Sequence, residues 1–292
     1  MGVINLILNL AGLLIWLGWR DLAINPLIEN SATPLARTLR HAGPDKLIRW
    51  KYLGGLAGLL LLRPLIYWWI GPAVNTKPLY LQLVAIAIPF RCDLFGQMVL
   101  FSLASFGVTL LFFYLALLLL SLVNRGVSDA EPLQKFVRNH LGRVEHLPFV
   151  VKLLLPVLVT TALWLVLSPL LARAEILPHA SSAGALVKQG LLISVGTGLV
   201  CKYVVATVLL LHFLNSYIYF GNHPLWNFVN ATARRLLAPL RWLPLKFGRM
   251  DFAPVVGIVV VFLLATVIEN GAHTKNHTLF SSLAERYENV SR

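Results

Sequence analysis

The chain has 292 residues, of which 58% are hydrophobic and only 13% are charged. Soluble globular domains carry roughly 25% charged residues, so this composition excludes an ordinary water-soluble protein. The 25 Lys and Arg residues against 12 Asp and Glu residues give a net charge of +13, which indicates contact with anionic lipid or the inner face of a membrane.

Long apolar segments follow one another along the chain. A bilayer core about 30 Å thick requires ~20 mostly uncharged residues in a helix. We therefore expect an all-α, polytopic helical membrane protein with about six transmembrane helices. The expected spans are residues 3–19, 53–73, 95–123, 147–171, 190–214 and 252–268. A shorter apolar stretch, 79–90, is predicted to be an interfacial or re-entrant helix.

The distribution of positive charge predicts the orientation. Most of the 25 Lys and Arg residues lie in the connections that follow the first, third and fifth spans. Cytoplasmic connections carry an excess of Lys and Arg. We therefore expect these three connections in the cytoplasm and both termini outside it, in a multi-pass protein of the cell inner (plasma) membrane.

Two stretches of the sequence resemble each other. The segments that start at Pro132-Leu133 and Pro224-Leu225 both continue to a Phe-Val pair at the same offset, and a fainter copy starts at Pro34-Leu35. Repeats of this kind predict a repeated architecture, here three helical hairpins. The expected divisions are a divergent hairpin at 1–78, an interfacial or re-entrant segment at 79–94, hairpins at 95–178 and 185–269, and a polar tail at 270–292.

The connection after the fifth span has helical periodicity. Leu and Val at 225, 229, 236, 240 and 243 share one face, and polar residues at 227, 230, 234 and 241 share another. We expect this helix in the headgroup plane, with its cations toward anionic lipid, and Pro239 should bend or end it. A plain juxtamembrane loop remains the alternative. The lipid-facing basic residues predicted in the two clearer copies are Lys135, Arg138, Arg234, Arg235 and Arg241.

The stretch NATARRLLAPLRWLPLKFGRMDFAPVVG, residues 230–257, resembles the signature of the YggT family of integral membrane proteins. The resemblance is strongest over 203–269, weaker over 112–171, and extends to a divergent third copy at 3–73. It implies a structural motif without a catalytic site. Relatives are connected with envelope homeostasis, cell division or cytochrome assembly. The motif positions are Pro224, Pro239, Arg241, Pro244, Gly248, Asp251 and Pro254.

Asp251 precedes the sixth span and is expected to cap it. A carboxylate at a helix N-terminus accepts hydrogen bonds from free backbone N–H groups and suits the helix dipole. Pro254 is compatible with the first turn, and Gly248 permits the turn before it. The sequence therefore favours a structural role for Asp251 over a chemical one.

Two charged residues, Arg63 and Lys202, lie inside the expected spans. A charge at the centre of a membrane helix costs at least ~2.5 kcal/mol, so such residues are functional candidates. They either face the helix bundle or snorkel to an interface, or they line an ion or substrate path. Acidic residues are absent from the span interiors, so neither has an obvious partner.

Motifs for catalysis or for binding a metal or cofactor are absent from the sequence. His273 and His277 have helical spacing for a metal, but no third ligand lies near them. The sequence favours a non-enzymatic organising or assembly factor without a cofactor, and the alternative is a small transporter or channel that uses Arg63 and Lys202. The expected partners are anionic lipid headgroups and an unidentified membrane protein or a second copy of the chain, and not nucleic acid.

Overall fold

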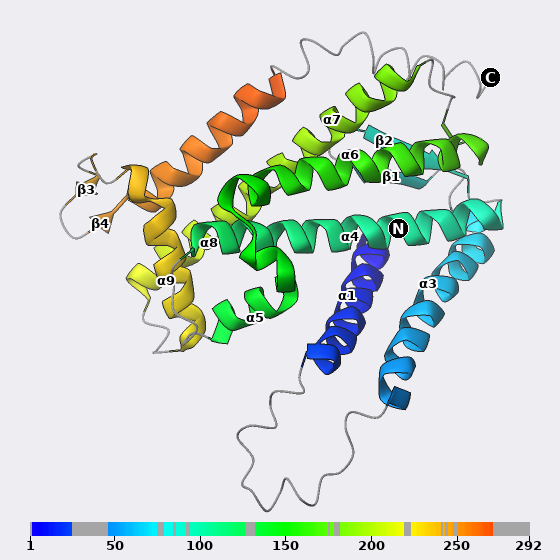
Figure 1. The fold of residues 1–292 in the computed structure, drawn as a ribbon, viewed down its shortest axis with the longest axis horizontal. Helices are drawn as coiled ribbons and strands as arrows, with labels where there is room; N and C mark the ends of the chain where they lie inside the picture. Colours follow the sequence, from blue (N-terminus) through cyan, green and yellow to red (C-terminus); the bar gives the residue numbers. More distant parts are fainter. Residues whose placement is uncertain are drawn as a thin grey trace, which may run out of the picture. The chain divides into compact units, whose positions relative to one another are not determined.

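Helices make up most of the described chain (Figure 1). The computed structural model describes residues 2–24, 46–74, 79–83, 86–91, 94–125, 132–174, 176–177, 182–218, 223–240, 242, 245–247 and 250–270. The helices are α1 (Gly2–Ile24), α3 (Lys46–Val74), α4 (Phe95–Val123), α5 (Pro132–Leu141), α6 (Phe149–Arg173), α7 (Ala183–Leu199), α8 (Cys201–Tyr217), α9 (Pro224–Leu236) and an unlabelled orange helix, Ala253–Asn270. Two short 3-10 helices, η2 (Gly142–His146) and η3 (Ala238–Leu240), follow α5 and α9.

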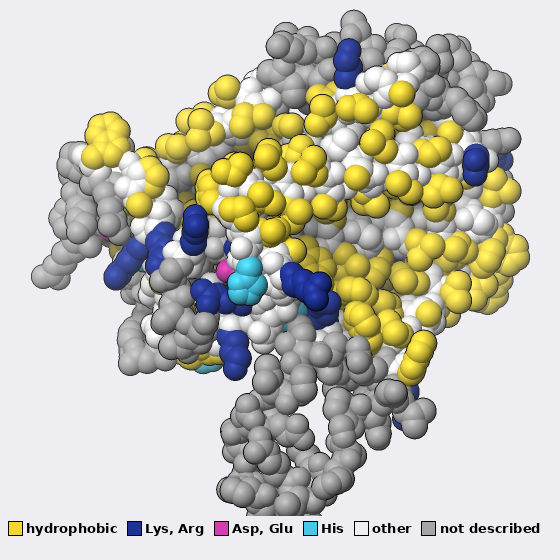
Figure 2. Space-filling view, in the orientation of Figure 1, with side chains coloured by type: hydrophobic (Ala, Val, Ile, Leu, Met, Phe, Trp, Pro, Cys, Tyr) yellow, Lys and Arg dark blue, Asp and Glu magenta, His cyan; other side chains and the backbone are white. Residues whose placement is uncertain are grey.

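Five helical segments of the described chain are long and apolar enough to cross a membrane. They are Val3–Arg20, Phe95–Val123, Phe149–Arg173, Ala183–Tyr217 and Ala253–Asn270. Many of their apolar side chains lie on the protein surface, where hydrophobic atoms cover much of the visible face (Figure 2). An apolar surface of this extent is incompatible with water. The chain is therefore an all-α polytopic membrane protein, as the composition predicts.

The second expected span, 53–73, falls on α3. This helix has 29 residues and carries Arg63 and Pro64 in its interior. It is helical as expected, but it is not among the five segments that meet the criteria for a span. A sixth crossing and the arrangement in three hairpins stay predictions.

Residues 79–83 and 86–90 form strands, so the prediction of a helix there is wrong. β1 (Leu79–Leu83) and β2 (Ile86–Phe90) pair in a two-stranded sheet. Apolar residues recur at every second position in both strands, which is the periodicity of a strand. Leu81, Ile88 and Phe90 are buried. A second small sheet pairs β3 (Lys246–Phe247) with β4 (Met250–Asp251) in antiparallel fashion.

The fifth expected span consists of two helices. α7 ends at Leu199, α8 begins at Cys201, and the N–H of Val200 bonds to the carbonyl of Thr197, three residues earlier. Two glycines flank Thr197 and weaken the helix there. The Thr197 hydroxyl also donates to a carbonyl four residues earlier, a bond that often bends helices. Lys202 therefore lies at the start of a helix.

The contacts divide the chain into two compact units, residues 1–82 with 87–113, and residues 83–86 with 114–292. In the first unit α1 packs along α3. Gly18 permits this approach, because a Cβ there would lie 2.6 Å from the Tyr52 ring. In the second unit α6 packs along α7, α8 contacts α9, and α5 also contacts α9.

Candidate functional site

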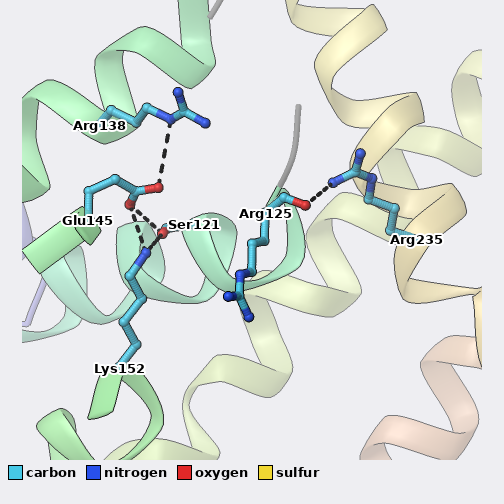
Figure 3. Close-up of polar contacts among 6 residues, drawn as sticks. All are labelled: Ser121, Arg125, Arg138, Glu145, Lys152 and Arg235. Atoms are coloured by element: carbon cyan, nitrogen blue, oxygen red, sulfur yellow. Dashed lines mark hydrogen bonds and ion pairs between the residues drawn. The ribbon is translucent and has the colours of Figure 1, made fainter. Parts of the chain in front are cut away.

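The C-terminal end of α4 is held by two residues of α9. A helix ends with carbonyls that lack intrahelical partners and carries a partial negative charge there. The Arg235 guanidinium donates to the carbonyl oxygens of Val123 (3.4 Å) and Arg125 (3.3 Å; Figure 3). The Asn124 amide donates to the Thr232 hydroxyl at 2.8 Å. α9 is therefore bound to α4 by groups that complete the helix end.

Glu145 is the centre of a buried charged cluster at the same end of α4 (Figure 3). The Lys152 ammonium lies 3.2 Å from Glu145 Oε2 and donates to the Ser121 hydroxyl at 3.0 Å. Ser121 in turn donates to Glu145 Oε2 at 2.5 Å. Arg138 Nε lies 3.7 Å from Glu145 Oε1. We call Ser121, Asn124, Arg138, Glu145, Lys152, Thr232 and Arg235 the α4-end cluster.

The α4-end cluster joins helices and does not present a reactive group. Ser121 is fully buried and its hydroxyl is directed to the Glu145 carboxylate, so a substrate has no access to it. A buried charge is tolerated when it is paired and hydrogen bonded. Lys152 is 6% exposed and has two such partners. These contacts fasten η2 and the start of α6 to α4.

The buried faces of α5 and α9 correspond to each other. The buried residues are Gln134, Val137, His140 and Leu141 on α5, and Phe228, Val229, Thr232 and Ala233 on α9. When Pro132 is aligned with Pro224, three buried positions coincide. Val137, His140 and Leu141 of α5 correspond to Val229, Thr232 and Ala233 of α9. Both helices also begin at the aligned proline. Equivalent burial supports the proposal of a repeat, and it places much of the apolar side of both helices against protein.

The predicted lipid-facing stripe of α9 is only partly at the surface. Val229 is buried in the protein, Leu236 is half-buried, and Leu225 is 38% exposed. α9 ends at Leu236, and Pro239 lies in η3 directly after it. The protein itself therefore covers part of the face that was expected to rest on lipid.

The five predicted basic residues have different environments. Lys135 and Arg234 are exposed, whereas Arg138 and Arg235 are half-buried and bound to Glu145 and to α4 carbonyls. Arg241 lies outside the described residues. The predicted basic residues therefore differ in how far their side chains are exposed at the surface.

Arg63 is held by neutral groups. Its guanidinium is 2% exposed and donates to the Asn9 side-chain oxygen (2.9 Å) and to the Ser105 hydroxyl (3.0 Å). The rings of Phe101 and Tyr67 lie 5.2 and 5.8 Å from the guanidinium carbon. No acidic residue of the described chain pairs with it. Arg63 therefore connects α1, α3 and the first part of α4 inside one unit.

Lys202 has an acidic partner, so the expectation that it lacks one is wrong. Its ammonium lies 2.6 Å from Glu269 Oε1, near the end of the helix Ala253–Asn270. The rings of Tyr203 and Phe262 lie 5.3 and 5.8 Å from the ammonium. The sequence placed Lys202 inside one continuous span. The break at Val200 instead brings it to the beginning of α8, opposite a helix end.

The motif residues of the resemblance lie at helix boundaries. Pro224 is the first residue of α9, and His223 before it accepts a hydrogen bond from the N–H of Leu225 at 3.3 Å. Asp251 Oδ1 accepts from the N–H of Ala253, the first residue of the helix, at 3.0 Å, so the carboxylate satisfies one of the free N–H groups at this helix end. Pro254 is buried in the first turn. Pro244 and Gly248 lie outside the described residues.

Sequence reasoning missed the Glu145 cluster. It counted Lys152 only as a cytoplasmic cation and placed Glu145 on a polar helix face. The sequence did contain a signal for this cluster. It was a single carboxylate directly before an apolar span, with a lysine in the first turn of that span. The described residues hold no group of three His, Cys, Asp or Glu side chains for a metal, and His273 and His277 lie outside them.

Residues 194–271 match the model of the family CCB3/YggT. The matched part runs from within α7 to just beyond the helix Ala253–Asn270, and it contains α8, α9, the Lys202–Glu269 pair and Asp251. The resemblance to the YggT family is confirmed for this part of the chain. The copies at 112–171 and 3–73 stay predictions. No curated protein and no solved structure matches the chain.

Proposed function

We propose, from the match of residues 194–271 to the CCB3/YggT family, that the chain is a non-enzymatic organising or assembly factor of the bacterial inner membrane. The processes that fit are envelope homeostasis, cell division and cytochrome assembly. The family match of residues 194–271 is the main support for the proposal. The buried contacts of the α4-end cluster support it, because they build a fixed polar platform from α5, η2 and α9 at the end of membrane helices.

Such a factor acts by binding other molecules. We propose that its basic connections lie in the cytoplasm and contact anionic lipid headgroups, and that a membrane protein or a second copy of the chain binds the platform. Asn227 on α9 is exposed and is suited to test for that partner.

The test is photo-crosslinking in native membranes. A photoreactive phenylalanine analogue replaces Asn227 in the full chain, and the adducts are purified and identified by mass spectrometry. We expect a discrete adduct with a membrane protein or with a second copy. The same analogue at exposed Val187 on α7 is the control and should give a different pattern. If both sites gave only lipid adducts, the proposal would be wrong.

A small transporter is the second candidate, and the observation that favours it is a charged guanidinium in the interior of the apolar helix α3, with no acidic partner among the described residues. In a transporter, Arg63 binds a solute anion at some stage of the cycle. Uptake of labelled solutes into proteoliposomes tests this candidate. Uptake by the wild-type chain that is lost in Arg63→Lys, with unfolding temperature unchanged, would support transport over assembly.

A further inference from the structure

The cations near α5 and α9 divide into two groups. Arg138, Lys152 and Arg235 are buried or half-buried and bind Glu145, Ser121 or the carbonyls of α4. These residues hold the platform together through their contacts with other parts of the chain. The cations with exposed side chains form what we call the exposed cation surface: Arg125, Lys135, Arg143 and Arg234.

Cations outnumber carboxylates in the part of the chain that carries the exposed cation surface. In the described parts of α5, η2, α9 and the end of α4, Glu145 is the one acidic residue, and its oxygens are already bound by the α4-end cluster. The connection 126–131 adds Asp129 and Glu131 to the sequence, yet cations still outnumber carboxylates. A surface with this excess attracts anionic groups.

The exposed cation surface borders an apolar surface. Phe149 and Val150, which follow η2 at the start of α6, are 45% and 62% exposed. Trp242, just beyond η3, is 80% exposed. Figure 2 shows dark blue side chains gathered beside the yellow face. Trp side chains and cations at the ends of apolar helices lie at the headgroup level, which favours lipid phosphates over a soluble acidic partner.

We propose that Arg125, Lys135, Arg143 and Arg234 bind the phosphate groups of anionic phospholipids in the leaflet beside α5 and α9. This inference rests on the proposed function and names the residues that contact the lipid. Arg138, Lys152 and Arg235 are not assigned to lipid, because their charged groups already contact Glu145, Ser121 or backbone carbonyl oxygens. Because the apolar sides of α5 and α9 are largely covered by protein, the headgroups bind at the rim of a folded platform and no helix inserts.

Lipid titration of the purified full chain tests the proposal. Native mass spectrometry measures the apparent Kd for phosphatidylglycerol and for phosphatidylcholine at low ionic strength. We expect tighter binding of phosphatidylglycerol. Each surface cation near anionic lipid contributes roughly a fivefold change in affinity. The double variant Lys135→Gln/Arg143→Gln should therefore weaken phosphatidylglycerol binding by more than about tenfold, without changing phosphatidylcholine binding.

A matched control removes two exposed cations elsewhere in the same unit. Arg173→Gln/Lys188→Gln changes the net charge equally and should leave the affinity within about twofold of wild type. Lys135→Arg/Arg143→Lys should retain wild-type binding. Equal losses in both Gln variants, or no preference of the wild type for phosphatidylglycerol, would overturn the proposal. The assay contains no partner protein. If the lipid titration contradicted the lipid site while protein crosslinks at Asn227 were still formed, the lipid site alone would be rejected and the proposed function would stand.

Discussion

Two ion pairs of this chain differ in the exposed fraction of their side chains. The Lys152 and Glu145 side chains are 7% and 13% exposed, whereas Glu269, the partner of Lys202, is 32% exposed. A buried charge that loses its partner destabilises a protein by several kcal/mol. Loss of one partner of the Lys152–Glu145 pair is therefore expected to destabilise the protein more than loss of one partner of the Lys202–Glu269 pair.

Replacement of Glu145 by Gln should lower stability substantially. The change keeps the shape of the side chain but leaves the Lys152 ammonium buried without a countercharge, which costs about 2 to 3 kcal/mol. Thermal unfolding in detergent measures the effect. Lys152→Met/Glu145→Gln should recover most of the loss, because the buried ammonium is removed together with its countercharge and only the half-buried Arg138 loses its contact with the carboxylate. Arg143→Gln, on an exposed neighbour, is the control, and an equal shift in that variant would contradict a special role for Glu145.

Close packing of α6 against α7 depends on one glycine of α7. A Cβ at Gly190 would lie 2.9 Å from Cγ2 and 3.4 Å from the backbone Cα of Thr161 on α6, whereas a Cβ at Gly198 on the same helix has no atom within 4 Å. Backbone cannot rotate away as a side chain does. Close contact of this kind is how membrane helices pack.

Gly190→Ala should therefore destabilise the second unit by about 1 to 2 kcal/mol, because α6 and α7 must separate to admit the methyl group. Gly198→Ala should leave stability unchanged or raise it, since Ala favours helix over Gly. The unfolding midpoint in a denaturing detergent measures both variants. If Gly198→Ala lowered the midpoint as much as Gly190→Ala, helix propensity and not packing would control the difference.

The elements of this chain differ in how well their sequences predicted them. Apolar length alone located α4 and α6 closely, because burial in lipid requires it. The strands at 79–90 were missed because a short apolar run fits a strand or a helix. The break at Val200 was missed because two glycines also occur inside intact membrane helices. The pairing of Lys202 with Glu269 joins residues 67 positions apart and depends on that break, so spacing could not reveal it.

At the scale of the whole molecule, the distribution of charge predicts the orientation in the membrane, and one helix makes this orientation measurable. Lys135 precedes α6 and Lys188 follows it, and both are exposed. α6 has 25 residues and crosses a membrane once if it spans it. The two lysines must then lie on opposite sides, and the excess of Lys and Arg predicts that Lys135 lies in the cytoplasm.

Cysteine labelling in spheroplasts tests this orientation. In a background of Cys92→Ser/Cys201→Ser, we expect a membrane-impermeant maleimide to label Lys188→Cys in intact spheroplasts, and to label Lys135→Cys only after permeabilisation. Arg173→Cys, exposed at the end of α6, should behave like Lys188→Cys. The reverse pattern would place α5 and its cations outside the cytoplasm. Equal labelling of Lys135→Cys and Lys188→Cys in intact spheroplasts would mean that α6 does not cross. Because the labelling of Lys135→Cys in intact spheroplasts shows on which side of the membrane the exposed cation surface lies, the experiment also decides which leaflet supplies its phosphates.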